Sequence, residues 1–258
     1  PHSRGQMTQH VFGHRPTALT NEKRILAKHH VFGASRLMQD GANCALYDPW
    51  TAKPGHLAQE NTRYRVASIT KMATALVTLR CIDNGLFALD SEAASLLPDG
   101  EKAPALSGVT VRHLLCHTSG LRDLPMLDSC LTDAKPSTEL LRQPELRDCA
   151  PGQQLIYSNF GLGLLGCILE QQTGLCIEPL FQEMLFRPLH MRATLDASTL
   201  NEAEIMPITR VLPYRAGQEL RVTALGRHPL QKPNPLCHYG HTAGAMYTDG
   251  RSVLQMLT

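Results

Sequence analysis

A serine and a lysine three residues apart stand at the start of an apolar helical pattern in the stretch YRVASITKMATALVTLRCIDNG, residues 64–85. Residues i and i+3 are neighbours on a helix, so the amine of Lys71 can reach the hydroxyl of Ser68 and take its proton. This geometry suits a nucleophilic serine. A plainer interpretation is also open, because serine is a common helix cap and a lysine in a first turn is often simply solvated.

A second triplet, Tyr157-Ser158-Asn159, stands just before another apolar helical pattern. It is the only Tyr-x-Asn sequence among the six tyrosines of the chain. Both motifs would occur together by chance in roughly a few per cent of chains of this composition. The pair of motifs therefore favours chemistry over two unrelated helix caps.

Ser-x-x-Lys at a helix start, followed by Tyr-x-Asn before a second helix, resembles the pattern of the class C β-lactamase and penicillin-binding-protein-like serine hydrolases. The resemblance continues through most of residues 60–195, in stretches that occur in the order expected for the family. These stretches are YRVASITKMATALV, VTVRHLLCHTSGL, PGQQLIYSNFGLGLLGCILEQQTG and LFRPLHM. Ala243-Gly244 is similar to the Ala-Gly-Gly segment that precedes the last catalytic motif of the family.

The resemblance implies an α+β fold of the β-lactamase/transpeptidase type, with an antiparallel sheet flanked by helices, a mostly helical lobe and the active site between them. Carried over by position, it implies that Ser68 is the acylated nucleophile. Lys71 and Tyr157 would manage the serine proton, and either is open as the main base. Asn159 would orient the substrate amide or the lysine. The backbone N–H of Ser68, at a helix start, is suited to form half of an oxyanion hole.

The implied reaction is acyl transfer without a cofactor. The carbonyl of a small molecule or peptide would acylate the serine and be released by water, and the carbonyl would belong to an amide, a D-amino-acid peptide, an ester or a β-lactam. The motifs are shared by enzymes that act on all of these substrates, so they do not name one.

The third motif of the family, Lys-Thr-Gly or His-Thr-Gly on a core strand, would follow Ala243-Gly244, and the 258 residues end before its expected place. His241-Thr242 is a substitute in which His241 would contact the substrate. The residues after it, however, predict entry into a helix and not a core strand. We therefore expect the remaining strands to lie on a second chain, to have been cleaved, or to be absent.

The elements that must position the motifs are predicted by periodicity and turn signals. Residues 31–48 predict two strands around the turn Asp40-Gly41. One helix is predicted to start at a cap on Thr110 and to close near Gly120. Another is predicted to follow Tyr157-Ser158-Asn159 and to end at Gly174.

Together with the resemblance, these elements predict a single serine-hydrolase domain over residues 1–258, and they leave open whether its C-terminal part is complete. Within it, we expect residues 1–67 to contribute a helix and sheet strands. Residues 68–212 are predicted to form a mostly helical lobe that carries the motifs. Residues 213–258 are predicted to be an irregular segment followed by the start of a return helix.

The composition is that of an ordinary globular protein, with 43% hydrophobic and 19% charged residues. A net charge of +2 without a basic run gives no reason to expect nucleic acid or an anionic membrane as partner. No apolar stretch is long enough to predict a membrane span. The first residues contain no signal-peptide core and predict a processed or trimmed terminus, so the compartment stays open.

No metal site is predicted. The eight cysteines form no C-x-x-C motif and favour reduced thiols, two of which, Cys81 and Cys167, lie inside apolar helical patterns. His113 and His117 have the i, i+4 spacing of zinc ligands on a helix, but no third ligand has a matching spacing. The family resemblance makes these two histidines structural residues near the site.

Further polar residues are expected to be surface or loop positions: His29-His30, Asp123 and Asp128. Two rival functions stay open. In the first, the chain is a non-catalytic relative that binds or senses an acyl ligand. In the second, it is one half of a two-chain hydrolase, which would expose apolar sheet surface on its own.

Overall fold

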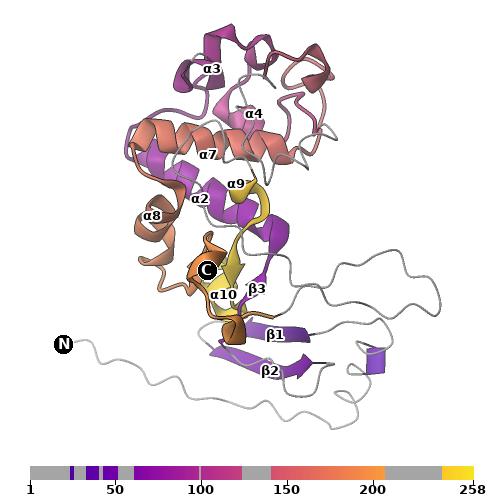
Figure 1. Ribbon diagram of the computed structural model, residues 1–258, viewed down its shortest axis with the longest axis vertical. Coiled ribbons are helices and arrows are strands. Elements are labelled where there is room, and N and C mark those ends of the chain that lie inside the picture. Colours follow the sequence, from indigo (N-terminus) through magenta and orange to yellow (C-terminus); the bar gives the residue numbers. More distant parts are fainter. Residues whose placement is uncertain are drawn as a thin grey trace. The chain divides into compact units, whose positions relative to one another are not determined.

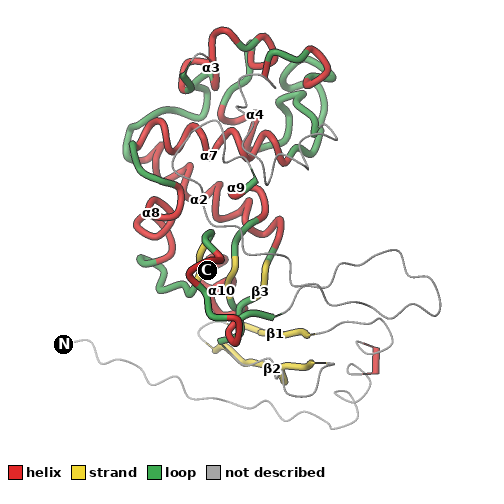
Figure 2. The backbone as a smooth tube through the Cα atoms, viewed as in Figure 1, coloured by secondary structure: helices red, strands yellow, loops and turns green. Residues whose placement is uncertain are grey.

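The computed structural model describes residues 24–25, 33–40, 43–51, 61–98, 100–123, 141–206 and 240–258. This part of the chain forms both helices and strands, and the fold is α+β (Figures 1 and 2). The strands are β1 (Gly33–Asp40), β2 (Asn43–Thr51), β3 (Tyr64–Arg65), β4 (Ala193–Thr194) and β5 (Tyr247–Thr248). The α-helices are α2 (Thr70–Asp83), α3 (Ala93–Leu96), α4 (Val111–Leu115), α7 (Asn159–Thr173), α8 (Ile177–Phe181), α9 (His241–Gly244) and α10 (Gly250–Leu257).

The chain divides into two compact units. The larger contains the described residues of 65–199 and 240–247, and the smaller contains the others. The predicted division at residues 67 and 212 is not tested by these units and stays a prediction.

Helix α7 is the centre of the larger unit, where it packs against α2, α3, α4, α8 and α9 (Figure 1). Every residue from Phe160 to Glu170 is buried. A helix that is apolar on all sides is expected to be surrounded in this way. It ends where predicted, at Gly174, whose φ of +70° is the left-handed conformation that glycine adopts at low cost.

Helix α2 lies beside α7 and buries one stripe that includes Ala73, Val77 and Cys81. The stripe also contains buried threonines whose hydroxyls are satisfied by carbonyls, as Thr78 Oγ1 donates to Thr74 O at 2.7 Å. The helix ends at Asp83, directly before Asn84-Gly85.

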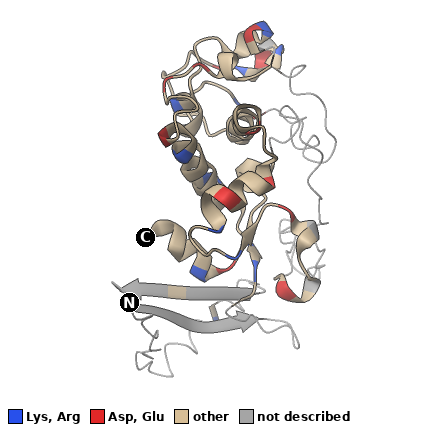
Figure 3. Cartoon of the chain, turned by 90° about the vertical axis from the view of Figure 1, so that its left-hand side faces the viewer, with Lys and Arg blue, Asp and Glu red and all other residues tan. Residues whose placement is uncertain are grey.

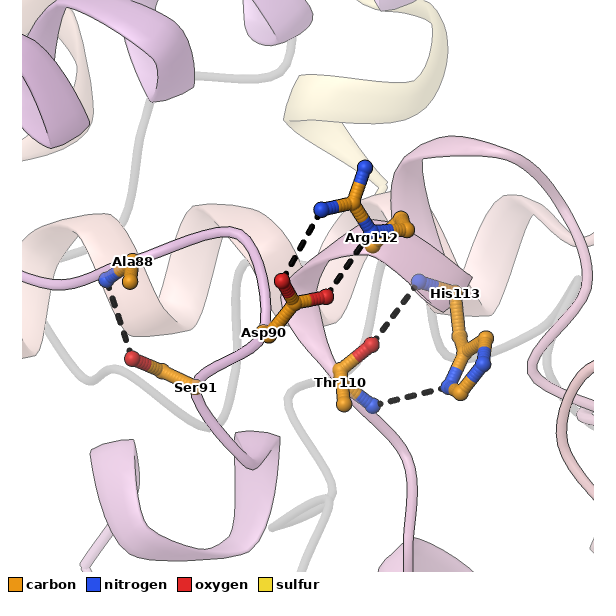
Figure 4. A network of polar contacts seen from close by, with 6 residues as sticks. All are labelled: Ala88, Asp90, Ser91, Thr110, Arg112 and His113. Atoms are coloured by element: carbon orange, nitrogen blue, oxygen red, sulfur yellow. Dashed lines mark hydrogen bonds and ion pairs between the residues drawn. The ribbon is translucent and has the colours of Figure 1, made fainter.

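Helix α4 is shorter than predicted. Its N-terminus carries a reciprocal capping box, in which Thr110 Oγ1 accepts from His113 N and His113 Nδ1 accepts from Thr110 N (Figure 4). The helix then stops at Leu115 and does not continue to Gly120. His117 has a φ of +56°, which ends the right-handed helix two residues after its last turn. A surface ion pair between Arg112 and Asp90, at 2.8 Å, adds little to stability because both side chains are exposed.

The smaller unit contains the predicted hairpin. Strands β1 and β2 are antiparallel, with Leu37 opposite Leu46 and an irregularity between Ala34 and Arg36, and the turn lies outside the described residues. Helix α10 packs on β1, and a Cβ on Gly250 would meet Leu37 Cδ1 at 2.4 Å, so a larger residue there would displace the Leu37 side chain.

The prediction for the segment before α10 is wrong. Residues 245–249 were expected to enter a helix directly, but Tyr247–Thr248 forms strand β5, which pairs between β3 and β4 in a three-stranded sheet. The helix begins only after Asp249, whose side chain accepts from Ser252 N. The predicted irregular segment 213–239 lies outside the described residues.

Acidic and basic side chains are interspersed over the described elements (Figure 3). No single helix in the described ranges is long and apolar enough to cross a membrane. The helices Asn159–Thr173 and Ile177–Phe186 reach that length and hydropathy only when taken together, and the chain bends by 85° between them. Cys81 and Cys167 are buried inside helices, and burial raises the pKa of the Cys81 thiol.

Candidate active site

Ser68 lies in a 3-10 turn, Ala67–Ile69, that leads directly into α2. Its side chain is exposed, and in the described part of the chain no side chain caps either the turn or the helix. Ala67 has a φ of +45°, a conformation that costs a non-glycine residue roughly 1–2 kcal/mol. Such local strain is concentrated at functional sites, and here it stands directly before the serine.

Lys71 joins three parts of the larger unit through its Nζ atom. Nζ donates to Ser68 Oγ at 3.1 Å, to Asn159 Oδ1 at 2.8 Å and to the carbonyl oxygen of Ala243 at 2.7 Å. The predicted i, i+3 contact is therefore present, and it joins the 3-10 turn to the first turn of α2. A lysine ammonium has three N–H donors, and these three acceptors match them in number.

Tyr157 lies on the other side of the serine hydroxyl. Its phenol oxygen is 2.6 Å from Ser68 Oγ, and Lys71 Nζ lies 4.8 Å from the centre of its ring. Partial burial opposes ionisation of the phenol. The hydrogen bonds from Lys71 and Ser68, together with the lysine charge, outweigh this burial and the opposing charge of Asp123, so the pKa of Tyr157 is lowered. Tyr157 therefore ionises more easily than an ordinary tyrosine.

Asp123 holds the start of α7 with both carboxylate oxygens. Oδ2 accepts from Asn159 N at 3.1 Å and from Asn159 Nδ2 at 2.7 Å. Oδ1 accepts from Phe160 N at 2.9 Å and from Ser158 Oγ at 3.2 Å. Because Nδ2 of Asn159 points at the carboxylate, its Oδ1 is directed at Lys71. Asp123 therefore fixes which end of the amide the lysine meets.

Helix α9 is inserted between α2 and α7 and brings Ala243 to the lysine. Thr242 is fully buried, donating to Leu162 O at 2.8 Å and accepting at its own carbonyl from Thr74 Oγ1 at 2.7 Å. The close approach needs Gly166, since a Cβ there would meet the Thr242 side chain at 2.7 Å.

The four central candidates, Ser68, Lys71, Tyr157 and Asn159, are thus joined by direct hydrogen bonds. His241 is half-buried at the first position of α9, and its assignment to the substrate stays a prediction.

Asp123 was missed as a site residue. It does lie in a loop, as expected, but its partners come 35–37 residues later, so no local sequence pattern could reveal them. The carbonyl of Ala243 was missed for the same reason, because a backbone oxygen has no sequence signature.

The two histidines with zinc-like spacing do not share a helix face, because α4 ends between them. His113 Nδ1 is used in the capping box, and His117 Nδ1 accepts from Ser158 N at 3.1 Å. Within the described ranges, no group of three His, Cys, Asp or Glu side chains is placed to hold a metal ion.

Comparison with known proteins shows the family of the chain. The family model for beta-lactamase matches residues 20–256. Monacolin J acid methylbutanoyltransferase of Aspergillus terreus is 33% identical over 156 residues, which cover 51% of this chain and 37% of that protein. A beta-lactamase of Yersinia enterocolitica is 30% identical over 176 residues, which cover 66% of this chain and 42% of that protein.

The fold is also that of solved relatives. The octameric penicillin-binding protein homologue from Pyrococcus abyssi matches 93% of this chain and 54% of its own, with a TM-score of 0.72 and 20% sequence identity. This likeness shows a β-lactamase/transpeptidase-like fold. The chain spans less than half the length of these two curated relatives.

Proposed function

Because the chain belongs to the beta-lactamase family, we propose that it is a serine hydrolase that forms an acyl-enzyme at Ser68. One observation carries the proposal. The serine hydroxyl oxygen lies 2.6 Å from the phenol oxygen of Tyr157 and 3.1 Å from Lys71 Nζ. A weak nucleophile next to a base that is itself oriented by a third group is the arrangement that activates serine in acyl transfer.

Tyr157 is the general base in this proposal. Lys71 is taken as an ammonium in this proposal, and an ammonium has no lone pair with which to take a proton. Lys71 therefore acts as a charged donor that stabilises the phenolate. A contact of 2.6 Å between Ser68 and Tyr157 fits a charge-assisted O–H···O⁻ bond, for which about 2.5–2.7 Å is usual.

The reaction then has two balanced halves. The phenolate of Tyr157 takes the hydroxyl proton of Ser68 while Oγ bonds to the carbonyl carbon of the substrate. The same proton passes to the leaving nitrogen or oxygen as its bond to carbon breaks. A water molecule next gives its proton to Tyr157 and attacks the ester, and the departing Oγ of Ser68 recovers a proton from the phenol.

The other groups have supporting roles. Asn159, held by Asp123, orients Lys71 in the state described here, and a substrate amide would compete for the same side chain. The backbone N–H of Ser68 supplies one oxyanion donor. We propose that the second donor comes from residues outside the described ranges, from a second chain or fragment, or from the vicinity of His241.

The acyl acceptor defines a second candidate function. The similarity to a methylbutanoyltransferase supports transfer of the acyl group from Ser68 to an acceptor other than water. The first half-reaction is unchanged. The substrate would again be a small molecule or peptide with an ester, amide, D-amino-acid peptide or β-lactam carbonyl, and no cofactor takes part.

The test is turnover of a p-nitrophenyl ester and a chromogenic cephalosporin by the protein, the Ser68→Ala variant and a matched control, Ser95→Ala, which removes an exposed serine on α3. We expect the parent and Ser95→Ala to release the chromophore and Ser68→Ala to release none. An added alcohol that captures the acyl group would identify the transferase. If a folded protein turns over neither substrate, the proposal fails and a non-catalytic acyl-binding relative remains.

A further inference from the structure

His117 makes three separate contacts with the three consecutive residues around Tyr157. Its carbonyl oxygen accepts from Ile156 N at 2.7 Å. Its imidazole Nδ1 accepts from Ser158 N at 3.1 Å. Its ring stacks on the ring of Tyr157, with the centroids 4.5 Å apart and the planes at 29°. One residue thus holds the backbone on both sides of the tyrosine and the face of its ring.

These contacts depend on an unusual backbone conformation. His117 has a φ of +56°, which costs a non-glycine residue roughly 1–2 kcal/mol. Glycine would adopt this conformation freely, yet it would offer neither a ring nor an acceptor. Asparagine tolerates the conformation and offers an acceptor without the ring. The contacts with residues 156–158 need a residue that adopts a left-handed φ, offers a hydrogen-bond acceptor and carries a ring. Of glycine, asparagine and histidine, only histidine does all three.

The bond to Ser158 also fixes the protonation state of His117. Nδ1 accepts only when it carries no hydrogen, so the imidazole is neutral with its proton on Nε2. The surroundings agree, because burial and the charge of Lys71 on α2 lower the pKa of His117 against the opposing charge of Asp123. A neutral ring adds no positive charge next to Tyr157.

We infer that His117 is a positioning residue for Tyr157, which holds the phenol oxygen against Ser68 Oγ through ring stacking and through the hydrogen bonds on either side of the tyrosine. The inference rests on the proposed function, in which the phenolate takes the serine proton. Tyr157 has an exposed fraction of 50%, so its ring is not enclosed by the core. The stack on His117 limits its rotation, together with the hydrogen bond to Ser68 and the contact of Lys71 Nζ with the ring.

The test compares two substitutions that separate the contacts. His117→Asn keeps an acceptor for Ser158 N and removes the ring. His117→Gly removes both and keeps the backbone carbonyl that Ile156 uses. A displacement of the base by about 1 Å costs roughly 100-fold in rate. We expect the acylation rate constant for a p-nitrophenyl ester to fall about tenfold in the first variant and about 100-fold in the second, with KM within twofold of the parent.

A role in folding alone predicts a different result. Both folded variants would then keep the parental rate constant, and only their melting temperatures would fall. Equal rate constants in His117→Asn, His117→Gly and the parent, measured where circular dichroism shows folded protein, would overturn the inference. Because glycine accepts the left-handed φ, the second variant is expected to fold even where the first does not.

A double-mutant cycle with Tyr157→Phe separates the inference from the proposed function. If His117 acts through the phenol, His117→Asn should change the acylation rate less than twofold in the Tyr157→Phe background. A full tenfold loss there would refute the positioning role and leave the proposed function standing. If Tyr157→Phe alone leaves the rate unchanged, it is the proposed base that fails.

Discussion

The two motif-bearing helix starts of the larger unit are built in opposite ways. At the start of α2, no side chain of the described residues caps the backbone, and Ser68 and Ile69 are exposed. At the start of α7, Ser158 Oγ accepts from Gly161 N at 2.9 Å, and Asp123 accepts from two more backbone N–H groups. Ser158 is only 1% exposed.

The difference separates reactive from structural polar groups. A serine that caps its own helix uses its hydroxyl oxygen to accept a hydrogen bond from a backbone N–H group, as Ser158 does. Ser68 does not, so its hydroxyl is available to Tyr157 and Lys71. Substitutions at the start of α2 should therefore affect activity with little effect on stability, whereas substitutions at the start of α7 should affect both.

The largest effect is expected for Ser68→Ala, compared with Ser158→Ala as the matched serine. Removing the nucleophile should lower kcat by about 10⁴-fold or more. The free energy of unfolding should change by no more than about 0.5 kcal/mol, because the side chain is exposed. Ser158→Ala should instead cost about 1 kcal/mol through loss of the cap. Ester hydrolysis measures kcat, and urea unfolding measures the free energy of unfolding. A large loss of kcat in Ser158→Ala together with a large loss of stability in Ser68→Ala would contradict the comparison.

Tyr157→Phe should have the next largest effect. It removes the base but keeps the ring that stacks on His117, so we expect kcat/KM to fall by about 10²–10⁴-fold in a folded protein. The lowered pKa of Tyr157 gives the pH dependence its sign. Because the phenolate is the active form, acylation by the parent should rise with pH and level off below the ordinary tyrosine value of about 10.

This alkaline rise should be absent from the Tyr157→Phe profile. A rise of equal size and midpoint in both proteins would assign the base to another group, and Lys71 would be the first to examine.

Asp123→Ala tests the α7 side of the comparison directly. It leaves two backbone N–H groups and the Asn159 amide without their acceptor, so the free energy of unfolding should drop by about 1–3 kcal/mol. Since the Asn159 amide is then free to turn, the acylation rate should fall as well, by roughly tenfold to 100-fold. Urea unfolding and single-turnover acylation would measure the two losses. A stable but slow variant would show that Asp123 serves chemistry alone.

The smallest effect concerns the packing that brings Ala243 to Lys71. Gly166→Ala places a Cβ 2.7 Å from the Thr242 side chain and should destabilise by about 1–3 kcal/mol. Gly161→Ala on the same helix meets nothing closer than 3.5 Å and should be neutral, or stabilise by up to about 1 kcal/mol. Thermal unfolding compares them. Equal melting temperatures would mean that α9 is not tightly seated on α7.

How much of the site could be predicted from sequence depends on how far apart in the chain the contacting residues lie. The Ser68–Lys71 contact, the hairpin and the end of α7 depend on residues close together in the chain, so periodicity and turn residues predicted them. The link from Tyr157 to Ser68 joins residues 89 positions apart and was predicted only by family resemblance. Asp123 has no local partner, which is why only its loop position was expected.

Two local predictions failed because tertiary contacts decided the outcome. The pattern from Thr110 to Gly120 favours a longer helix, yet His117 adopts a left-handed conformation that brings it to Tyr157 and Ser158. Residues before α10 lack a clear strand pattern, and Tyr247–Thr248 becomes a strand because β3 and β4 pair with it. Pairing partners far away in sequence are not visible in a local window.

Intact-mass spectrometry after treatment with a fluorophosphonate or a penicillin tests the central claim most directly, namely that Ser68 is the acylated nucleophile. We predict one adduct per chain in the parent and in Ser158→Ala, located on the peptide that contains Ser68 and absent from Ser68→Ala. An adduct that persists in folded Ser68→Ala, or no adduct in any folded form of the protein, would contradict the account.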